Sequence, residues 1–277
     1  MSFKLGLIGY PIQHSLSPWI HAQFLERTEQ KGTYEIMEID TNASFPEAMD
    51  KLKNSQIDGF NVTVPYKEKI IPYLDHIDEQ AKKIGAVNTV KCENGVWTGY
   101  NTDGAGYVRS LLSKYPQLAE EKSAKILLLG AGGAAKGIYH ALVAAGYEHI
   151  VIANRTVEKA QDIVKEDKNS KVATLNEVAE DLAEFRVIIQ TTSVGMKPEV
   201  DQSIITLNHL HDDAIVSDIV YQPLETKILT DAKNLNADIH FGHTMLLYQA
   251  QYAFEIWTGK SPNMEGLDEA LQNILEG

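Results

Sequence analysis

One run of residues restricts the fold of this chain more than any other. The mostly apolar run 125–129 is followed by the turn Gly130-Ala131-Gly132-Gly133 and then by a helix-like stretch, 134–145. Glycine at 130 permits a tight turn, glycine at 132 lets the backbone approach a pyrophosphate, and Ala135 is small enough for close helix–strand packing. Because a helix start also offers free N–H groups and a partial positive charge, the pattern predicts a dinucleotide-binding turn.

The residues around this turn repeat the same rhythm. Strand-like apolar runs at 149–153, 187–191 and 214–219 follow it, and the stretch 157–167 between the first two is helix-like. Alternating strands and helices are typical of a parallel sheet covered on both faces. We therefore predict an α/β fold with a Rossmann-like, doubly wound parallel sheet in residues 106–238.

The first hundred residues predict a different sheet. Two strand-like runs, 86–92 and 95–100, are joined by the turn Glu93-Asn94, which indicates an antiparallel hairpin. Further strands are expected at 4–8, 34–39 and 59–64. Residues 1–105 are therefore predicted to form a second α/β domain with a mixed sheet. The segment from Gly242 onward is helical in pattern and fits either domain.

Charge and composition exclude several functions. The 277 residues carry a formal net charge of −13, which disfavours nucleic acid and anionic membranes as partners. No secretory signal, membrane-length apolar run or metal-ligand spacing stands out, so we expect a cytoplasmic protein without a metal. The single cysteine, Cys92, allows no intrachain disulfide and fits a reducing compartment.

The strand after the glycine turn indicates which nucleotide is bound. An NAD site usually has an acidic residue at its end for the ribose 2′-OH, whereas this chain has Asn154-Arg155-Thr156, with Lys159 one turn later. The alternative interpretation is that Arg155 and Lys159 only form a solvated, basic loop and helix face. The guanidinium falls where a 2′-phosphate is expected and matches its geometry, so the sequence favours NADP over NAD.

Polar residues gather at strand ends in the first domain. Ser15 and Ser17 follow the first strand, where they either cap a helix or bind a polar ligand. Asn61 and Thr63 share one side of a strand, and Lys67 follows just after it. A pair of Lys67 and Asp103 would suit proton transfer, but their spacing in the sequence does not show that they meet.

These motifs resemble the shikimate dehydrogenase family along nearly the whole chain. The segments that carry the resemblance, in order, are Gly9-Tyr10-Pro11-Ile12, His14-Ser15-Leu16-Ser17-Pro18, Asn61-Val62-Thr63-Val64-Pro65 with Lys67, Gly85-Ala86-Val87-Asn88-Thr89, Asn101-Thr102-Asp103-Gly104, residues 130–135, Asn154-Arg155-Thr156, Thr191-Thr192-Ser193-Val194-Gly195-Met196, Asp218-Ile219-Val220-Tyr221, and Gly242 with Met245-Leu246 and Gln249-Ala250. Ala22 and Lys136 depart from residues common in the family, Asn and Arg respectively, at positions where no catalytic role is expected.

The resemblance implies reversible NADPH-dependent reduction of 3-dehydroshikimate to shikimate, in a monomer or homodimer. It places 239–277 on the substrate domain and implies catalytic roles for Lys67 and Asp103. Substrate contacts are implied for Ser15, Ser17, Asn61, Thr63, Asn88, Tyr221 and Gln249. The implied cofactor-lining residues are Gly130, Ala131, Gly132, Gly133, Ala134, Asn154, Arg155, Thr156, Lys159, Ile219 and Gly242.

Three other functions deserve comparison. A quinate/shikimate dehydrogenase differs in substrate breadth and often in cofactor, and the cluster around Arg155 favours the NADP-specific type. A methylene-tetrahydrofolate dehydrogenase is not expected to carry both the paired serines and the Gln249 motif. A non-catalytic NADP-binding sensor on the same fold would not need Lys67 and Asp103 together.

Overall fold

The computed structural model describes residues 2–165, 167 and 169–277. The chain divides into two compact units. The first unit contains Met1–Gly106 and Leu247–Glu265, and the second contains Tyr107–Leu246 and Gly266–Gly277. None of the helices in the described residues combines the length and apolarity needed to cross a membrane.

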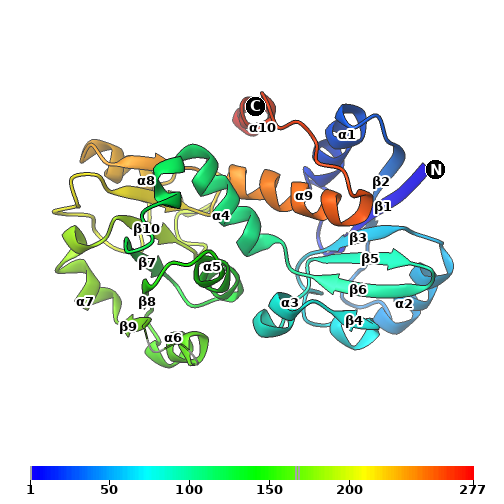
Figure 1. Cartoon of the computed structure of the whole chain (residues 1–277), viewed down its shortest axis with the longest axis horizontal. Coiled ribbons are helices and arrows are strands. Elements are labelled where there is room, and N and C mark those ends of the chain that lie inside the picture. The colour runs from blue at the N-terminus through cyan, green and yellow to red at the C-terminus, as the bar shows by residue number, and fades with distance from the viewer. Residues whose placement is uncertain (1, 166, 168) are drawn as a thin grey trace. The chain divides into compact units, whose positions relative to one another are not determined.

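The first unit is built around a six-stranded mixed sheet with the strand order β2-β1-β3-β5-β6-β4. Its elements are β1 (Ser2–Gly9), α1 (Ser17–Arg27), β2 (Lys31–Glu38), α2 (Phe45–Asn54), β3 (Gly59–Val62), η1 (Ile71–Tyr73), β4 (His76–Ile77), α3 (Glu79–Ile84), β5 (Thr89–Glu93) and β6 (Val96–Tyr100). The predicted hairpin is confirmed, because β5 and β6 pair antiparallel with Glu93 opposite Val96. Figure 1 shows these two strands side by side.

The second unit contains a six-stranded sheet in the order β12-β11-β10-β7-β8-β9, and every pair in it is parallel. Its elements are η2 (Pro116–Ala119), β7 (Lys125–Leu129), α5 (Gly133–Ala144), β8 (His149–Ala153), α6 (Val157–Val164), β9 (Lys171–Ala173), α7 (Leu175–Ala179), η3 (Leu182–Glu184), β10 (Val187–Gln190), β11 (Ile215–Asp218), α8 (Lys227–Asn234), β12 (Asp238–His240) and α10 (Leu267–Glu276). If β7 is taken as the first strand of this unit, the order reads 6-5-4-1-2-3, which is the doubly wound Rossmann order. The predicted parallel sheet is therefore confirmed.

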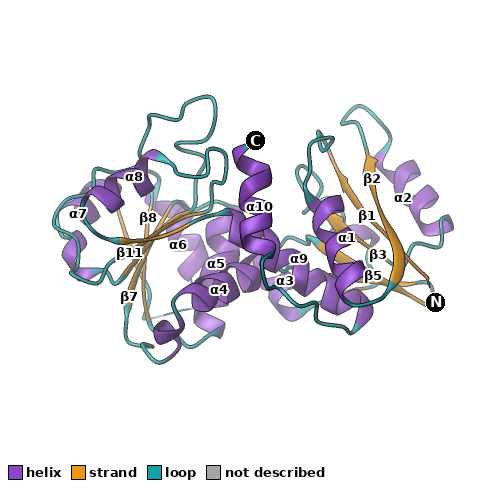
Figure 2. Ribbon diagram, turned by 90° about the horizontal axis from the view of Figure 1, so that it is seen from above, coloured by secondary structure: helices purple, strands orange, loops and turns teal. Residues whose placement is uncertain are grey.

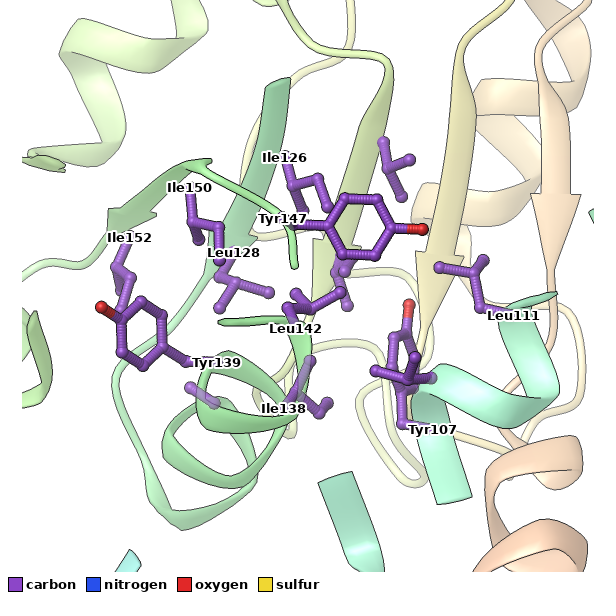
Figure 3. Packing of buried hydrophobic residues seen from close by; sticks show 14 of the residues in the cluster. Tyr107, Leu111, Ile126, Leu128, Ile138, Tyr139, Leu142, Tyr147, Ile150 and Ile152 are labelled. Atoms are coloured by element: carbon purple, nitrogen blue, oxygen red, sulfur yellow. The ribbon is translucent and has the colours of Figure 1, made fainter. Parts of the chain in front are cut away.

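Helices lie on both sides of the parallel sheet (Figure 2), and an apolar cluster fills the space on each face. Along β7, Ile126 and Leu128 join the cluster with α5, whereas Leu127 and Leu129 join the cluster with α8. Figure 3 shows the first layer, where Ile138 and Leu142 of α5 pack toward the strands. Burial on both faces explains why these strands read as continuous apolar runs rather than as alternating patterns.

Two helices differ from the sequence expectations. The helix expected at 157–167 ends at Val164 as α6 (Val157–Val164), and Glu166 lies outside the described residues. A helix that the sequence did not predict, α4 (Asp103–Lys114), crosses the expected boundary at residue 106. It forms despite Gly104 and Gly106 because its residues Tyr107 and Leu111 are buried in the apolar cluster of the second unit.

The C-terminal region divides between the units, whereas the sequence placed all of 239–277 on the first domain. Helix α9 (His243–Thr258) begins in the second unit, and its larger part belongs to the first. Gly266–Gly277 groups with the second unit. One reason is the contact of 2.5 Å between His243 Nε2 and Asp268 Oδ1, which ties α10 to the start of α9.

His21 on α1 makes the stability of the first unit depend on pH. Its ring is buried, and this burial lowers its pKa from 6.5 to about 3, although the side chain of Asn61 opposes the shift. Between these values the unfolded chain binds a proton that the folded chain does not. The contribution of His21 is therefore complete above pH 6.5 and is lost as the pH falls toward 3. Between pH 7.5 and 5.5 the loss is about 1.4 kcal/mol.

We expect His21→Phe to remove this dependence while keeping an aromatic ring against Tyr34. Neither ring nitrogen of His21 has a partner within hydrogen-bond distance among the described residues, so the variant loses at most the weak interaction with the Asn61 side chain. The measurement is the free energy of unfolding in urea at pH 7.5 and 5.5, where the wild type should lose about 1.4 kcal/mol more than the variant. His76→Gln, at an exposed histidine, should behave as the wild type. Equal losses in wild type and His21→Phe would contradict the assignment.

Candidate active site

Lys67 and Asp103, which are 36 positions apart in the sequence, meet in the first unit. The Lys67 Nζ atom lies 2.6 Å from Asp103 Oδ2, and both side chains are partly exposed. Lys67 follows β3, and its carbonyl accepts a hydrogen bond of 2.8 Å from the N–H of Val87, which fixes the backbone there. Asp103 is the first residue of α4, where its N–H donates to the side chain of Asn101 at 3.1 Å.

Asn88 connects this ion pair to its surroundings. Its amide nitrogen lies 2.9 Å from Asp103 Oδ1, 2.9 Å from the Thr102 hydroxyl and 3.4 Å from Gln249 Oε1. Its amide oxygen accepts from the Thr102 N–H at 2.8 Å, so the orientation of the amide is fixed by the protein. Because Asn88 directly precedes β5, one rigid strand holds this polar centre in place.

Gln249 reaches the same centre from α9. Helix α4 approaches α9 closely at Gly106, because a Cβ atom added there would lie 2.5 Å from the backbone nitrogen of Gln249. Only glycine allows this approach, which brings Gln249 to the amide of Asn88. The structure thus groups Lys67, Asn88, Asp103 and Gln249, four of the predicted site residues, around one point.

The paired serines lie at the start of α1. Ser15 Oγ donates to Ser17 Oγ at 3.2 Å and accepts from the Ser17 N–H at 3.3 Å. The N-cap residue is Leu16, which makes no side-chain capping bond. Ser17 is buried, whereas Ser15 is partly exposed.

Asn61 and Thr63 share the end of β3 but differ in their surroundings. Asn61 is buried, and its amide nitrogen donates to the Asn88 carbonyl and the Thr89 hydroxyl, both at 3.1 Å. Thr63 is partly exposed just beyond the strand, with its N–H bonded to the Ile8 carbonyl at 2.9 Å. The Asn61 side chain is therefore committed to contacts within the protein.

The glycine turn of the second unit has room for a pyrophosphate. Gly130 has a φ of 113°, and an added Cβ would meet Thr191 and Thr192, so the turn requires glycine. A Cβ at Gly132 or Gly133 would meet nothing within 4 Å. Helix α5 begins at Gly133 without a side-chain cap, which leaves its first N–H groups available for phosphate oxygens. With the small residues Ala131 and Ala134, this turn fits a dinucleotide.

The predicted 2′-phosphate site follows β8. Asn154 Nδ2 donates to the Thr156 carbonyl at 2.8 Å, which shapes the turn before α6. Arg155, Thr156 and Lys159 are exposed around the first turn of α6. Among the described residues, neither Arg155 nor Lys159 forms an ion pair, so both cations are available to an anion.

Ile219, Tyr221 and Gly242 lie together at the ends of β11 and β12 in the second unit. A Cβ added at Gly242 would lie 2.4 Å from the Ile219 carbonyl oxygen, so the two backbones are in direct contact. Tyr221 is partly buried, and this burial raises its pKa. It belongs to the second unit, unlike the other six predicted substrate contacts.

Asp218, at the end of β11, holds this loop in place. Its carboxylate accepts from the Thr226 hydroxyl at 2.6 Å, the Val220 N–H at 2.9 Å and Gln190 Nε2 at 3.1 Å. Burial raises its pKa to about 6, although these three donors oppose the shift.

Comparison with known proteins decides the family. The family description "shikimate dehydrogenase substrate binding domain" matches residues 7–90, "shikimate / quinate 5-dehydrogenase" matches 113–219, and "shikimate 5′-dehydrogenase C-terminal domain" matches 242–272. The shikimate dehydrogenase (NADP(+)) of Oceanobacillus iheyensis is 53% identical over 277 residues, which cover 100% of each chain. The chain belongs to the shikimate dehydrogenase family.

Solved structures agree with this membership of the shikimate dehydrogenases. The Thermus thermophilus shikimate 5-dehydrogenase in complex with NADP(H) and shikimate is 32% identical, with 98% of this chain and 99% of that chain covered and a TM-score of 0.86. The Corynebacterium glutamicum quinate dehydrogenase in complex with NAD is 27% identical, with 100% and 99% covered and a TM-score of 0.87. The predicted fold class and family are therefore confirmed.

Sequence reasoning assigned no role to three polar residues that contact or hold predicted site positions within their own units, namely Thr102 and Tyr34 in the first and Asp218 in the second. Thr102 stood in a quoted motif, yet its role as a partner of Asn88 follows only from the structure. Asp218 also stood in a motif, where its place at the end of an apolar strand was a usable signal. Tyr34 carried no signal, since an aromatic residue in a strand usually indicates packing.

Proposed function

We propose that this chain interconverts 3-dehydroshikimate and shikimate with NADPH and NADP, and that Lys67 and Asp103 act at the reacting oxygen. Membership of the family makes the chain an oxidoreductase acting on a CH–OH group with NADP as its cofactor. The observation that carries the residue assignment is the 2.6 Å contact between Lys67 and Asp103, beside the amide of Asn88.

The proposed role of Lys67 is to move one proton. When bound, NADPH supplies the hydride to the ring carbon C3. The carbonyl oxygen there must gain a proton, and the Lys67 ammonium, held by Asp103, donates it. In the oxidation direction the neutral amine takes the proton from the hydroxyl. Asp103 orients the ammonium and stabilises its charge through the 2.6 Å contact with Lys67 Nζ.

The remaining substrate contacts follow from the chemistry of a carboxylated, hydroxylated ring. Ser15 and Ser17 provide hydroxyl donors for the carboxylate, and Tyr221 provides a third. Thr63, Asn88 and Gln249 bind ring hydroxyls, and the amide of Asn88 is shared between Asp103 and Gln249 in the free protein. Asn61 acts here by holding the backbone of Asn88.

The cofactor would be held by the second unit. Its pyrophosphate would fit the turn from Gly130 to Ala134, where no side chain caps the first N–H groups of α5. Asn154, Arg155, Thr156 and Lys159 would hold the 2′-phosphate, and Ile219 and Gly242 would line the nicotinamide end. The lone Cys92 favours a cytoplasmic location for this enzyme. We expect the enzyme to be a monomer or a homodimer.

Arg155→Ala tests the cofactor part of this proposal. We expect the wild type to prefer NADP to NAD as its cofactor and shikimate to quinate as its substrate. The variant should raise the KM for NADP roughly 10- to 100-fold, because a charge-assisted pair with phosphate is lost, and leave the KM for NAD nearly unchanged. The assay is absorbance of the reduced cofactor formed from shikimate and, separately, from quinate.

Lys165→Ala is the matched control, since it removes an exposed cation at the other end of α6. It should leave both KM values at the wild-type level. An equal rise in the KM for NADP and NAD in Arg155→Ala would refute the role of Arg155. A wild type that oxidises quinate better than shikimate would refute the substrate assignment.

A further inference from the structure

Tyr34 links the two ends of the predicted substrate site. It lies on β2 opposite Leu5 of β1, and β2 runs next to α1 (Figure 1). Its hydroxyl donates a hydrogen bond of 2.7 Å to Asn61 Oδ1. Since the amide nitrogen of Asn61 is bonded to the Asn88 carbonyl and the Thr89 hydroxyl, Tyr34 connects through Asn61 to Asn88 and the start of β5.

The other side of Tyr34 faces α1 and the serines. Ser17 and His21 are one helical turn apart and so share a face of α1. The His21 ring stacks on the Tyr34 ring at 4.3 Å with an angle of 10° between the planes. Burial raises the pKa of Tyr34, and an interaction with the Ser17 side chain opposes this shift. The phenol is therefore bonded to Asn61 on β3 and stacked on the His21 ring, one turn beyond Ser17 on α1.

The His21 ring, which stacks on Tyr34, is itself held by other aromatic side chains. The His21 ring also contacts Trp257 at 5.2 Å and Phe24 at 5.6 Å between ring centroids. Trp257 in turn donates from its indole nitrogen to the Val90 carbonyl at 2.9 Å. These contacts hold the stacked rings of Tyr34 and His21 between β3, which carries Asn61, and α1, which carries Ser17.

We propose that Tyr34 is a positioning residue that sets the distance between the carboxylate-binding serines and the Asn88–Asp103–Lys67 centre. The proposal rests on the proposed function, in which these two groups bind two substituents, the carboxylate and the C3 oxygen, of one rigid ring. A six-membered ring holds its carboxylate and its C3 oxygen at a fixed spacing, and the site must reproduce that spacing. Tyr34 thus selects for carboxylated rings without touching the substrate.

Tyr34→Phe tests this role because it keeps the stack on His21 and removes only the hydroxyl. We expect the KM for shikimate to rise roughly tenfold, with kcat changed less than about threefold, as for loss of one hydrogen bond. The KM for NADP should stay at the wild-type level. The preference for shikimate over its methyl ester should shrink by a similar factor, since the carboxylate is the group that Ser17 is positioned to bind.

Two further variants separate positioning from general destabilisation. Tyr147→Phe removes an equivalent buried phenol, bonded to the Leu118 carbonyl at 2.8 Å in the second unit, and should leave shikimate kinetics unchanged. In a Ser17→Ala background, Tyr34→Phe should raise the KM for shikimate less than about threefold further, because both act on the same contact.

The outcomes are distinguishable. A wild type without shikimate oxidation by NADP would overturn the proposed function itself. An active wild type with Tyr34→Phe kinetics unchanged, or with losses that multiply fully with Ser17→Ala, would overturn only the role of Tyr34. A parallel rise in the KM for NADP would show a structural defect and also overturn it.

Discussion

Lys67→Ala should lower kcat by about 10³-fold while the KM for shikimate changes little. General acid catalysis by a positioned side chain accounts for an effect of this order, and the proton is transferred only as the reaction proceeds. The Lys67 ammonium has Asp103 as its ion-pair partner, 2.6 Å away, and it is partly exposed, as a group that exchanges protons with a ligand must be. The measurement is kcat and KM at saturating NADP across a range of shikimate concentrations.

Lys69→Ala is the matched control for this variant. Lys69 is exposed two residues further along and lies over the ring of Tyr66 at 5.7 Å, so its removal takes away the same charge nearby. It should retain a kcat close to that of the wild type. If Lys67→Ala instead kept kcat and showed a large rise in KM, Lys67 would be a binding residue rather than the proton donor.

The parts of the fold that the sequence predicted are those in which local pattern and packing agree. The run Lys125–Leu129 is continuous and apolar, it ends at a glycine that the turn requires, and both faces of the strand are buried. The hairpin of β5 and β6 was equally visible as two strand-like runs joined by a short turn, although the turn residues are Asn94 and Gly95, both with positive φ, rather than Glu93 and Asn94. In such segments no tertiary contact has to override the local preference.

Helix α4 shows why other parts were not predictable. Gly104 and Gly106 lower its intrinsic helix propensity, and the sequence analysis placed only a domain boundary there. Gly106 is required by a neighbour more than 140 residues later, the backbone of Gln249, and Tyr107 is held by a buried hydrogen bond of 2.7 Å to Ser217. The short strands β9 and β12, of three residues each, likewise depend on pairing with longer neighbours.

The candidate site was predictable as a set of residues but not as an arrangement. Polar residues at strand ends indicated Lys67, Asn88 and Asp103, because such positions meet at a sheet edge. No sequence rule gave the 2.6 Å contact between Lys67 and Asp103 or the orientation of the Asn88 amide. Nothing in the sequence indicated a role for Tyr34, because its phenol acts through Asn61. Asn61 itself was predicted to contact the substrate.

Asp103→Asn should lower kcat by roughly 10²- to 10³-fold, although the two side chains have nearly the same shape. Both carboxylate oxygens of Asp103 accept hydrogen bonds, one from Lys67 Nζ at 2.6 Å and one from Asn88 Nδ2 at 2.9 Å. An asparagine offers one oxygen and one NH₂ group. In either orientation its NH₂ faces a donor, so the variant loses the negative charge and also displaces either Lys67 or Asn88.

The comparison of single and double variants decides whether the two residues form one unit. If Asp103 acts by holding Lys67, the double variant Lys67→Ala/Asp103→Asn should be less than about threefold slower than Lys67→Ala alone, because residues that act together are not additive. Asp50→Asn, at an exposed carboxylate on α2, should leave kcat unchanged. Losses that multiply in the double variant would mean that Asp103 acts independently of Lys67, through its own hydrogen bond to the reacting hydroxyl.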